Sequence, residues 1–317
     1  MTSRRDFIGA ALAASAVGTG CATTAAAEGI SELPASTGPE QTDDPSLRVR
    51  FLGTGAADWE RAPKTGKIYR RWSCVLIDNR FLIDFTHKSE DMIPDGCRPK
   101  AILYTHSHPD HYDPRAALKL GVKHVFASRT WIADTKAEYE KALAAVGGEL
   151  PVFHPLDVGK RFRLGPYEIL PVPGNHYADR WYEQALLYKV TKLCKDGPAR
   201  LFYATDTSGI MSSAYFLACR SKEPINAVIM ESCGRPGHKF DGLSISHSTA
   251  DRVKEIFSTI LKPGKSAYRP SSPDQPVYLT HVGYGDWGTN TFDEELGPGF
   301  KVASDGQEIE VRPLSGN

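Results

Sequence analysis

Several features are absent from this chain of 317 residues, and each absence argues against a class of protein. The six cysteines form no Cys-x-x-Cys pair, which argues against a zinc ribbon and against a dense disulfide framework. Net charge is also absent, because 38 Lys and Arg balance 38 Asp and Glu, so no overall charge attracts nucleic acid or anionic lipid. No internal repeat indicates a solenoid. The expected partner is therefore a small molecule.

Residues 1–27 have the pattern of an export signal. Residues 2–8 read Thr-Ser-Arg-Arg-Asp-Phe-Ile, and an uncharged run of mostly Ala, Gly and Thr continues to Ala27. This pattern resembles a twin-arginine signal peptide. Because small residues contribute little transfer free energy, we expect removal near Ala27 and export to the periplasm rather than a permanent transmembrane helix. Lipidation of Cys21, which would anchor the protein to a membrane, is one alternative, and an ordinary disordered N-terminus is the other.

Residues 28–46 are rich in Pro, Ser, Gly and acidic residues and lack an apolar period, which predicts a flexible linker. No shift in composition divides residues 47–317, so we expect one folded domain there. Strand-like runs and helical spacing are mixed through it, which predicts an α/β fold. The strand-like runs are RVRFLG, SCVLID, RFLIDF, AILYT, RFRLG, YEILPV, ALLYKV, RLFYAT, AVIM and PVYLT. Helical spacing occurs at 114–120, 129–146 and 249–261.

Two local signals specify where elements turn or begin. The pair Asp78-Asn79 predicts a hairpin turn between the second and third strand-like runs. Ser248 and Asp251 have the spacing of a capping box, which predicts that the last helix begins beside His247.

Four potential metal ligands follow the run AILYT within six residues: His106, His108, Asp110 and His111. Such a cluster arises by chance in on the order of one chain in a thousand. Residues two apart in an extended segment point the same way, so His106 and His108 can reach one metal, while Asp110 and His111 can reach a second. Further donors each follow a strand-like run, and they are His176, Asp206 and His281.

This order of ligands resembles the metallo-β-lactamase superfamily, whose fold is a four-layer αββα sandwich with a binuclear site. The resemblance covers nearly all of residues 47–317. It implies that one metal is held by His106, His108 and His176, that the other is held by Asp110, His111 and His281, and that Asp206 bridges both. Imidazole and carboxylate donors without thiolate suit zinc, our first choice, but also manganese or iron.

The chemistry expected of such a site is hydrolysis without a protein nucleophile. Two divalent ions can share a hydroxide that attacks the substrate, and Asp110 could orient it. His247 is the candidate general acid for the leaving group, because it lies just before a helix N-terminus, where phosphate is favoured. The structural alternative for His247 is a helix-capping or buried histidine.

Three further stretches narrow the resemblance: FLGTGAA, RRWSCVLID and the sequence His-Ser-Thr-Ala from residue 247. They resemble the phosphodiesterase branch of the superfamily, which includes phosphoribosyl cyclic phosphodiesterases and transfer-RNA 3′-processing ribonucleases. No basic Gly/Pro-rich arm occurs between His111 and Asp206, so a small (cyclic) phosphodiester is favoured over nucleic acid. Within FLGTGAA, the turn Gly53-Thr54-Gly55 would let the backbone approach the metal loop, or would simply end a strand tightly.

Two other functions remain open at this stage. The same metals could act on a carbonyl substrate, as in a lactonase or β-lactamase, or the protein could be a catalytically silent metal-binding protein. Among other residues, the aromatic segment 180–188 is expected in the core, with a place near the pocket mouth as the alternative. The remaining histidines are expected to be structural or exposed, and they are His87, His124, His154 and His238.

Overall fold

A computed structural model gives the structure of this chain and describes residues 31–32, 38–62, 69–220, 222–238, 246–262, 267–272 and 274–314. The predicted signal peptide lies outside the described residues. Part of the predicted linker is described and contacts the domain, since Ser31 N donates to Phe153 O at 2.8 Å and Thr42 N donates to Leu193 O at 2.9 Å. In the part of the chain that the structure covers, no helix is long and apolar enough to cross a membrane.

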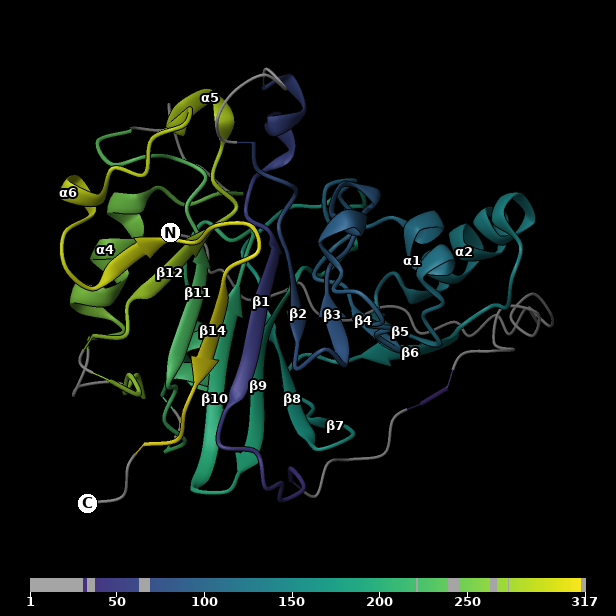
Figure 1. The fold of residues 1–317 in the computed structure, drawn as a ribbon, viewed down its shortest axis with the longest axis horizontal. Coiled ribbons are helices and arrows are strands. Elements are labelled where there is room, and N and C mark those ends of the chain that lie inside the picture. The colour runs from purple at the N-terminus through teal and green to yellow at the C-terminus, as the bar shows by residue number, and fades with distance from the viewer. Residues whose placement is uncertain are drawn as a thin grey trace, which may run out of the picture.

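Two seven-stranded sheets pack face to face (Figure 1). The first sheet begins antiparallel, from β14 to β3, and continues parallel from β3 to β6. Its strands, in spatial order, are β14 (Glu308–Val311), β1 (Leu47–Gly53), β2 (Cys74–Ile77), β3 (Phe81–Ile83), β4 (Ala101–Leu103), β5 (His124–Ser128) and β6 (Val152–Leu156). The edge strand β6 contains Pro155, which an edge position tolerates because it lacks the second ladder.

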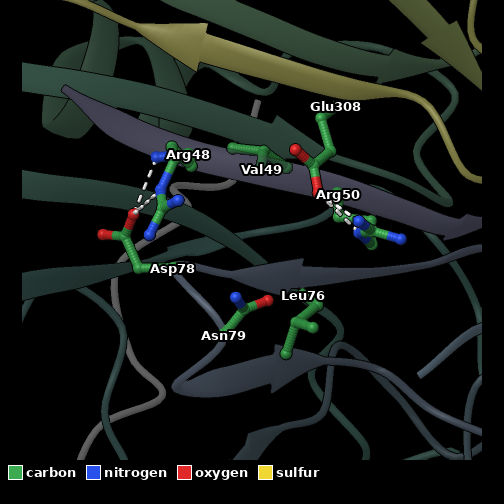
Figure 2. A pocket seen from close by; sticks show the side chains of 7 residues that line it. All are labelled: Arg48, Val49, Arg50, Leu76, Asp78, Asn79 and Glu308. Atoms are coloured by element: carbon green, nitrogen blue, oxygen red, sulfur yellow. Dashed lines mark hydrogen bonds and ion pairs between the residues drawn. The ribbon is translucent and has the colours of Figure 1, made fainter. Parts of the chain in front are cut away.

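The predicted hairpin turn between β2 and β3 is confirmed. Asp78 and Asn79 both have left-handed backbone angles, with φ of +46° and +59°, as a two-residue hairpin loop requires. Figure 2 shows the small surface depression beside this turn, which the Arg48–Asp78 and Arg50–Glu308 ion pairs border. Its volume of about 10 Å³ has room for about one water molecule, so it is no substrate site.

The second sheet is antiparallel from β7 to β10 and parallel from β10 to β13. Its strands, in spatial order, are β13 (Phe300–Val302), β12 (Val277–Thr280), β11 (Ala227–Glu231), β10 (Gly197–Ala204), β9 (Leu186–Cys194), β8 (Tyr167–Pro173) and β7 (Phe162–Leu164). Because β8 and β10 are both antiparallel to β9, they run in the same direction as β11 and β12. The C-terminal ends of β8, β10, β11 and β12 therefore lie at one edge of this sheet.

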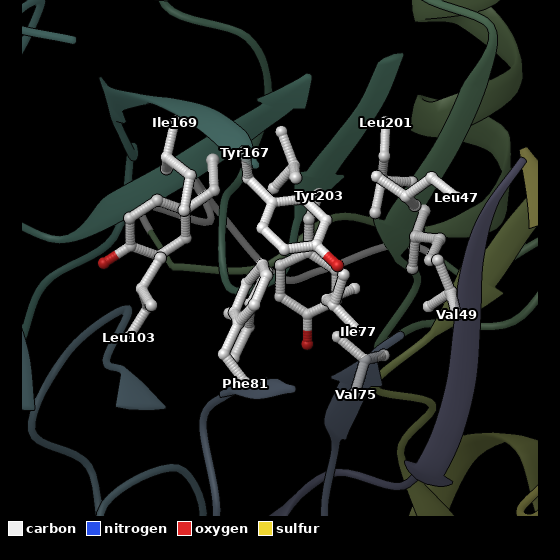
Figure 3. Packing of buried hydrophobic residues seen from close by; sticks show 14 of the residues in the cluster. Leu47, Val49, Val75, Ile77, Phe81, Leu103, Tyr167, Ile169, Leu201 and Tyr203 are labelled. Carbon is white, nitrogen blue, oxygen red and sulfur yellow. The ribbon is translucent and has the colours of Figure 1, made fainter. Parts of the chain in front are cut away.

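Alternating apolar residues place one hydrophobic core between the sheets and one on each outer face. Figure 3 shows the inner core, in which Val75 and Phe81 of the first sheet pack with Tyr167 and Leu201 of the second. On the outer face of the first sheet lie η2 (His87–Met92), α1 (Pro114–Leu120) and α2 (Ile132–Val146). The other helices are η1 (Ala57–Arg61), α3 (Ser212–Ala214), η3 (Tyr215–Cys219), α4 (Ala250–Thr259), α5 (Tyr284–Trp287) and α6 (Asp293–Leu296). Side chains of α3, η3, α4, α5 and α6 enter the core on the second sheet, which completes the expected αββα sandwich.

The sequence patterns located most of the described strands and the three longest helices, and one local prediction needs correction. The N-cap of α4 is Thr249, whose hydroxyl accepts from Arg252 N at 3.2 Å, so the capping box predicted for Ser248 is wrong. Ser248 instead donates to Thr207 O at 2.8 Å, and Asp251 accepts from Gly237 N at 2.7 Å. Four short strands were missed, namely β5, β6, β13 and β14.

The glycines of the Gly53-Thr54-Gly55 turn allow it to pack closely against the backbone at Trp72 and the ring of Trp59. A Cβ on Gly53 would lie 1.9 Å from Trp72 O, and one on Gly55 would lie 2.5 Å from the Trp59 ring. These contacts require glycine for the close approach of two backbone segments. The backbone of the turn also approaches a candidate metal loop, because Val282 N, next to His281, donates to Thr54 O at 3.1 Å. Both readings of this turn therefore have support.

Candidate metal centre

All seven predicted ligands converge at the edge of the sandwich where strands of both sheets end. His106, His108, Asp110 and His111 lie in the loop after β4 of the first sheet. His176, Asp206 and His281 follow β8, β10 and β12 of the second sheet. Their donor atoms form two groups, each with all atoms within 4.8 Å of one another: the first is His106, His108 and His176, and the second is Asp110, His111 and His281. Donor atoms of His106, His111 and Asp206 also lie within that distance of one another, so Asp206 links the two groups. We call these seven residues the donor cluster.

The first group brings three imidazole rings together. The ring centroids of His106 lie 4.6 Å from those of both His108 and His176. His176 Nε2 lies 3.1 Å from His108 Nδ1, and its other nitrogen contacts Ser246 O at 2.7 Å. Because the carbonyl fixes the His176 ring through Nδ1, Nε2 is the atom that it offers to the cluster.

The second group combines imidazole and carboxylate. His281 Nε2 lies 3.2 Å from Asp110 Oδ2, and His111 Nε2 lies 3.5 Å from the same oxygen. Asp206 lies between the two groups: its Oδ2 is 2.9 Å from His111 Nε2 and its Oδ1 is 3.7 Å from His176 Nε2. Asp206 thus contacts one member of each group.

The donor cluster fits a pair of cations because buried polar atoms in it lack partners. His106 Nε2 is buried and has no hydrogen-bond partner among the described residues. His111 Nε2 and Asp206 Oδ2 are also buried, and although they lie 2.9 Å apart as an ion pair, neither makes a hydrogen bond to a described residue. Such atoms are rare in folded proteins, because each costs desolvation free energy that nothing offsets. A bound divalent ion would satisfy all three, and the N/O donors suit zinc, manganese or iron.

Electrostatics within the cluster support the same fit. Burial alone would raise the pKa of Asp110 and Asp206, but the nearby imidazoles, His111 above all, outweigh it and hold both pKa values well below the usual range. Burial lowers the pKa of His106 well below its usual value. The site therefore presents ionised carboxylates and a neutral His106, which are the forms that bind metal. The carboxylates, Asp206 above all, also outweigh burial at His111 and His281, raising the pKa of His111 well above its usual value and that of His281 to about 10. These two rings would have to release a proton when a cation binds.

The sequence analysis missed Asp84, which contacts the candidate ligand His111 through the ring nitrogen that faces away from the cluster. Its Oδ2 lies 2.8 Å from His111 Nδ1, while its two oxygens accept from Thr105 N and Thr105 Oγ1, each at 2.8 Å. Asp84 is fully buried at the end of β3 and has a φ of +59°. A charged residue within the apolar run RFLIDF was the available signal.

Glu231 was also missed, and it organises the second sheet's side of the centre. This fully buried carboxylate ends β11 and accepts from Thr207 N at 2.7 Å and Ser248 N at 3.0 Å. Its other oxygen lies 2.9 Å from His247 Nδ1 and 3.6 Å from His281 Nδ1. An acid directly after the apolar run AVIM was the signal, the same context that singled out Asp206 after LFYAT.

His247 lies against the donor cluster, as the sequence analysis expected. Its ring stacks on His281 with centroids 5.3 Å apart and meets His176 edge-on at 5.1 Å. Burial alone would lower the pKa of His247, but the charge and contact of Glu231 outweigh it and raise that pKa. The side chain is 27% exposed, so it borders both the cluster and solvent.

The remaining histidines lie away from the cluster or at the surface. His87, which could have approached the site, contacts Trp72 edge-on at 5.7 Å and Asp113 Oδ2 at 2.8 Å, with a side chain 54% exposed. His124 and His154 pair with each other on β5 and β6, and His238 contacts Asp286. The segment 180–188 divides: Tyr188 is in the core, as expected, whereas Trp181 is 94% exposed, so that expectation is wrong for Trp181.

Comparison with known proteins identifies the family of this chain and finds solved structures with a similar fold. Residues 53–260 match the family model described as the Beta-lactamase superfamily domain. The fold is similar to that of the Zn²⁺-bound PqqB from Methylobacterium extorquens, with a TM-score of 0.62 and 13% identity over 83% of this chain and 100% of that one. It is similar to the metallo-β-lactamase fold protein YhfI from Bacillus subtilis, with a TM-score of 0.57 and 15% identity over 84% of this chain and 99% of that one.

Unliganded yeast PDE1 also has a similar fold, with a TM-score of 0.56 and 10% identity over 84% of this chain and 99% of that one. No curated protein matches the sequence. At these identities the solved structures establish the fold alone, and the family-model match establishes the family.

Proposed function

The chain belongs to the metallo-β-lactamase superfamily, a superfamily of metal-dependent hydrolases, and from that premise we propose that it cleaves a small phosphodiester with two metal ions. The observation that carries the choice of phosphodiester is the pairing of His247 with the buried carboxylate of Glu231 at 2.9 Å, beside the donor cluster. A phosphodiester with an alkoxide leaving group needs its leaving oxygen protonated, and a fixed imidazole at the metal centre can do this.

The ligand assignment is part of the proposal. His106, His108 and His176 would hold one ion, while Asp110, His111 and His281 would hold the other and Asp206 would bridge them. When bound, the two ions would lower the pKa of water and withdraw charge from the ester under attack. We propose zinc because its preferred donors are those present, with manganese and iron as the alternatives that elemental analysis distinguishes.

Residues of the protein would orient the ligand rings, transfer the proton and position the attacking water. Asp84 and Ser246 O orient the rings of His111 and His176 through their Nδ1 atoms. Glu231 contacts His247 through Nδ1, so proton transfer to the leaving oxygen would use Nε2. Asp110, beside His111 and His281, would orient the attacking water.

The test compares leaving groups rather than activity alone. Protein loaded with zinc or manganese should hydrolyse bis-p-nitrophenyl phosphate. His247→Ala should lower kcat about 100-fold or more for a diester with an alkoxide leaving group, and much less for one that releases p-nitrophenolate, which needs no proton. His87→Ala, which removes an exposed histidine, is the matched control and should change neither rate.

Two results would contradict the proposal. Turnover of a lactone or nitrocefin that His247→Ala leaves intact, with bis-p-nitrophenyl phosphate untouched, would make the protein a carbonyl hydrolase. Silence of the metal-loaded protein across phosphodiesters, phosphomonoesters, lactones and β-lactams would make it a metal-binding protein without turnover.

We also propose export to the periplasm, on the Arg4-Arg5 pair and the uncharged run after it. Replacing both arginines by lysine should retain the protein in the cytoplasm, as fractionation and immunoblotting would measure. Export of the double variant would contradict the twin-arginine assignment. Membrane association lost in Cys21→Ser would indicate lipidation instead of release.

A further inference from the structure

A loop with three exposed aromatic side chains lies beside the donor cluster, between β8 and β9. Tyr177 follows His176 directly, and its ring stacks on the His176 ring with centroids 5.7 Å apart and planes 17° from parallel. The same ring meets His108 edge-on at 5.9 Å. Although it contacts two candidate ligands, Tyr177 is 57% exposed. A ligand at the metals would therefore have an open aromatic ring at its side.

The other exposed aromatic residues follow within the same loop. Trp181 is 94% exposed and Tyr182 is 40% exposed, and their rings meet edge-on at 5.5 Å. Three large aromatic side chains within six residues leave much apolar area in contact with water. Exposed groups of apolar residues of this kind mark binding surfaces, because folding alone does not favour them.

The C-terminal part of the loop, next to Trp181, is anchored to two other segments of the chain before any ligand binds. The Glu183 carboxylate accepts from Ser107 N at 2.7 Å and from Ser107 Oγ at 2.6 Å, between the ligands His106 and His108. Tyr182 Oη donates to Asp134 Oδ2 of α2 at 2.8 Å. A preorganised surface binds more tightly, because less conformational entropy is lost on binding.

The charges of the loop favour a substrate with little negative charge. Arg180 is paired with Glu138 and Glu183, so it is not a dedicated anion-binding group. Asp179 Oδ1 lies 3.7 Å from His108 Nε2, and its exposed carboxylate would repel additional phosphates next to the metals. A diester with a single charge suits this surface better than a polyphosphate.

From this arrangement we infer that Tyr177 and Trp181 form an aromatic platform that binds a planar ring of the substrate, a nucleobase or an aryl group, beside the scissile phosphodiester. The inference rests on the proposed phosphodiesterase function and names its substrate class. Every nucleobase has a π-face, so stacking on such a platform would select for a ring while tolerating different bases.

The test uses two diesters with the same p-nitrophenolate leaving group: the p-nitrophenyl ester of thymidine 5′-monophosphate and methyl p-nitrophenyl phosphate. The readout is the ratio of their kcat/KM values, so a general loss of activity cancels. The native ratio should favour the thymidine ester, and Trp181→Ala or Tyr177→Ala should lower it by about threefold to tenfold. Tyr177→Phe should keep it, because the ring remains.

Phe216→Ala is the matched control, since Phe216 on η3 is 57% exposed and outside this loop, and its ratio should equal the native one. A native kcat/KM ratio near one, or a ratio unchanged in both alanine variants, would overturn the platform. Hydrolysis of the methyl ester in the same assay would still support the proposed function. Hydrolysis of neither ester would count against the proposed function itself.

The platform has a second readout that needs no turnover. Thymidine 5′-monophosphate binding to the metal-loaded protein, measured by calorimetry, should weaken about threefold to tenfold in Trp181→Ala and stay unchanged in Phe216→Ala. Equal binding by the native protein and Trp181→Ala would overturn the platform.

Discussion

Three residues of the metal centre have a backbone conformation that residues other than glycine rarely adopt. Asp84, Asp206 and His281 have φ of +59°, +48° and +52°, and each follows the end of a strand. Such a conformation costs of order 1–3 kcal/mol and persists where the surroundings impose it. The turn at each strand end directs a donor into the cluster, so local backbone strain accompanies the site.

Removal of Asp206 should have a larger effect than removal of His281. Asp206 contacts His111 at 2.9 Å and His176 at 3.7 Å, one member of each group, whereas His281 belongs to the second group. We expect Asp206→Ala to lose both metals and His281→Ala to lose mainly one. Elemental analysis of purified protein measures the metal-to-protein ratio, and full occupancy in both variants would refute the assignment.

Asp84 acts through His111, so its replacement should weaken metal binding without removing a ligand. Asp84→Asn keeps the size of the side chain but loses the charge that faces His111 Nδ1 at 2.8 Å. We expect metal affinity about 10- to 100-fold lower, as is typical when a partner of a ligating histidine is changed. Competition with a chromogenic chelator measures the affinity. Asp91→Asn, which changes an exposed acid paired with Arg71, is the control, and an equal effect there would contradict the role of Asp84.

At the scale of elements, the packing of β6 against β5 buries His154, and its ring should make the free energy of unfolding depend on pH. His124 Nδ1 lies 3.1 Å from His154 Nε2, and His154 Nδ1 contacts Ser31 O at 3.1 Å. Burial, and then the neighbouring His124, lower the pKa of His154 below its usual value. Because the folded protein disfavours the protonated ring, this contribution is present above about pH 6.5 and is lost as pH falls below that value.

His154→Gln should therefore reduce the loss of unfolding free energy between pH 7.5 and pH 5, measured by urea denaturation. The pH dependence of the metal centre is common to both proteins and cancels in the difference. His87→Gln, which replaces an exposed histidine, should retain the native slope. A native slope in His154→Gln would show that His154 does not titrate as expected.

At the scale of the whole molecule, the metal centre joins the two halves of the sandwich. His106, His108 and His111 come from the first sheet, and His176, Asp206 and His281 come from the second. Metal binding should therefore stabilise the contact between sheets as well as the loops. A ligand at 100 times its Kd stabilises the folded state by about 2.7 kcal/mol.

Chelation should accordingly lower Tm by about 5 °C or more, and added zinc should restore it. Differential scanning calorimetry measures the change. Asp206→Ala should respond to neither treatment, because it lacks the residue that contacts both groups. An unchanged Tm in the chelated native protein would show that the sheets do not depend on the metals.

Much of the molecule could be predicted from the sequence, because the signals that mattered are local. The cluster from His106 to His111 lies within six residues, and His176, Asp206 and His281 each follow an apolar run that became a strand. The helix at 114–120 was located to the residue by its helical spacing, and in the structure Asp113 caps it and Gly121 ends it in the left-handed region. Periodicity and capping act between near neighbours, so the order of residues contains them.

Other features depended on the tertiary structure. Asp84 and Glu231 looked like ordinary strand ends, and only the packing of distant segments placed them behind His111 and His247. Trp181 lies within a segment whose composition predicts a core, yet anchoring of the loop through Glu183 to Ser107 leaves it exposed. The sequence by itself determined the candidate donors and the strands that precede them. Folding decided which residues support those donors and which aromatic rings face solvent, because both depend on contacts between segments far apart in the chain.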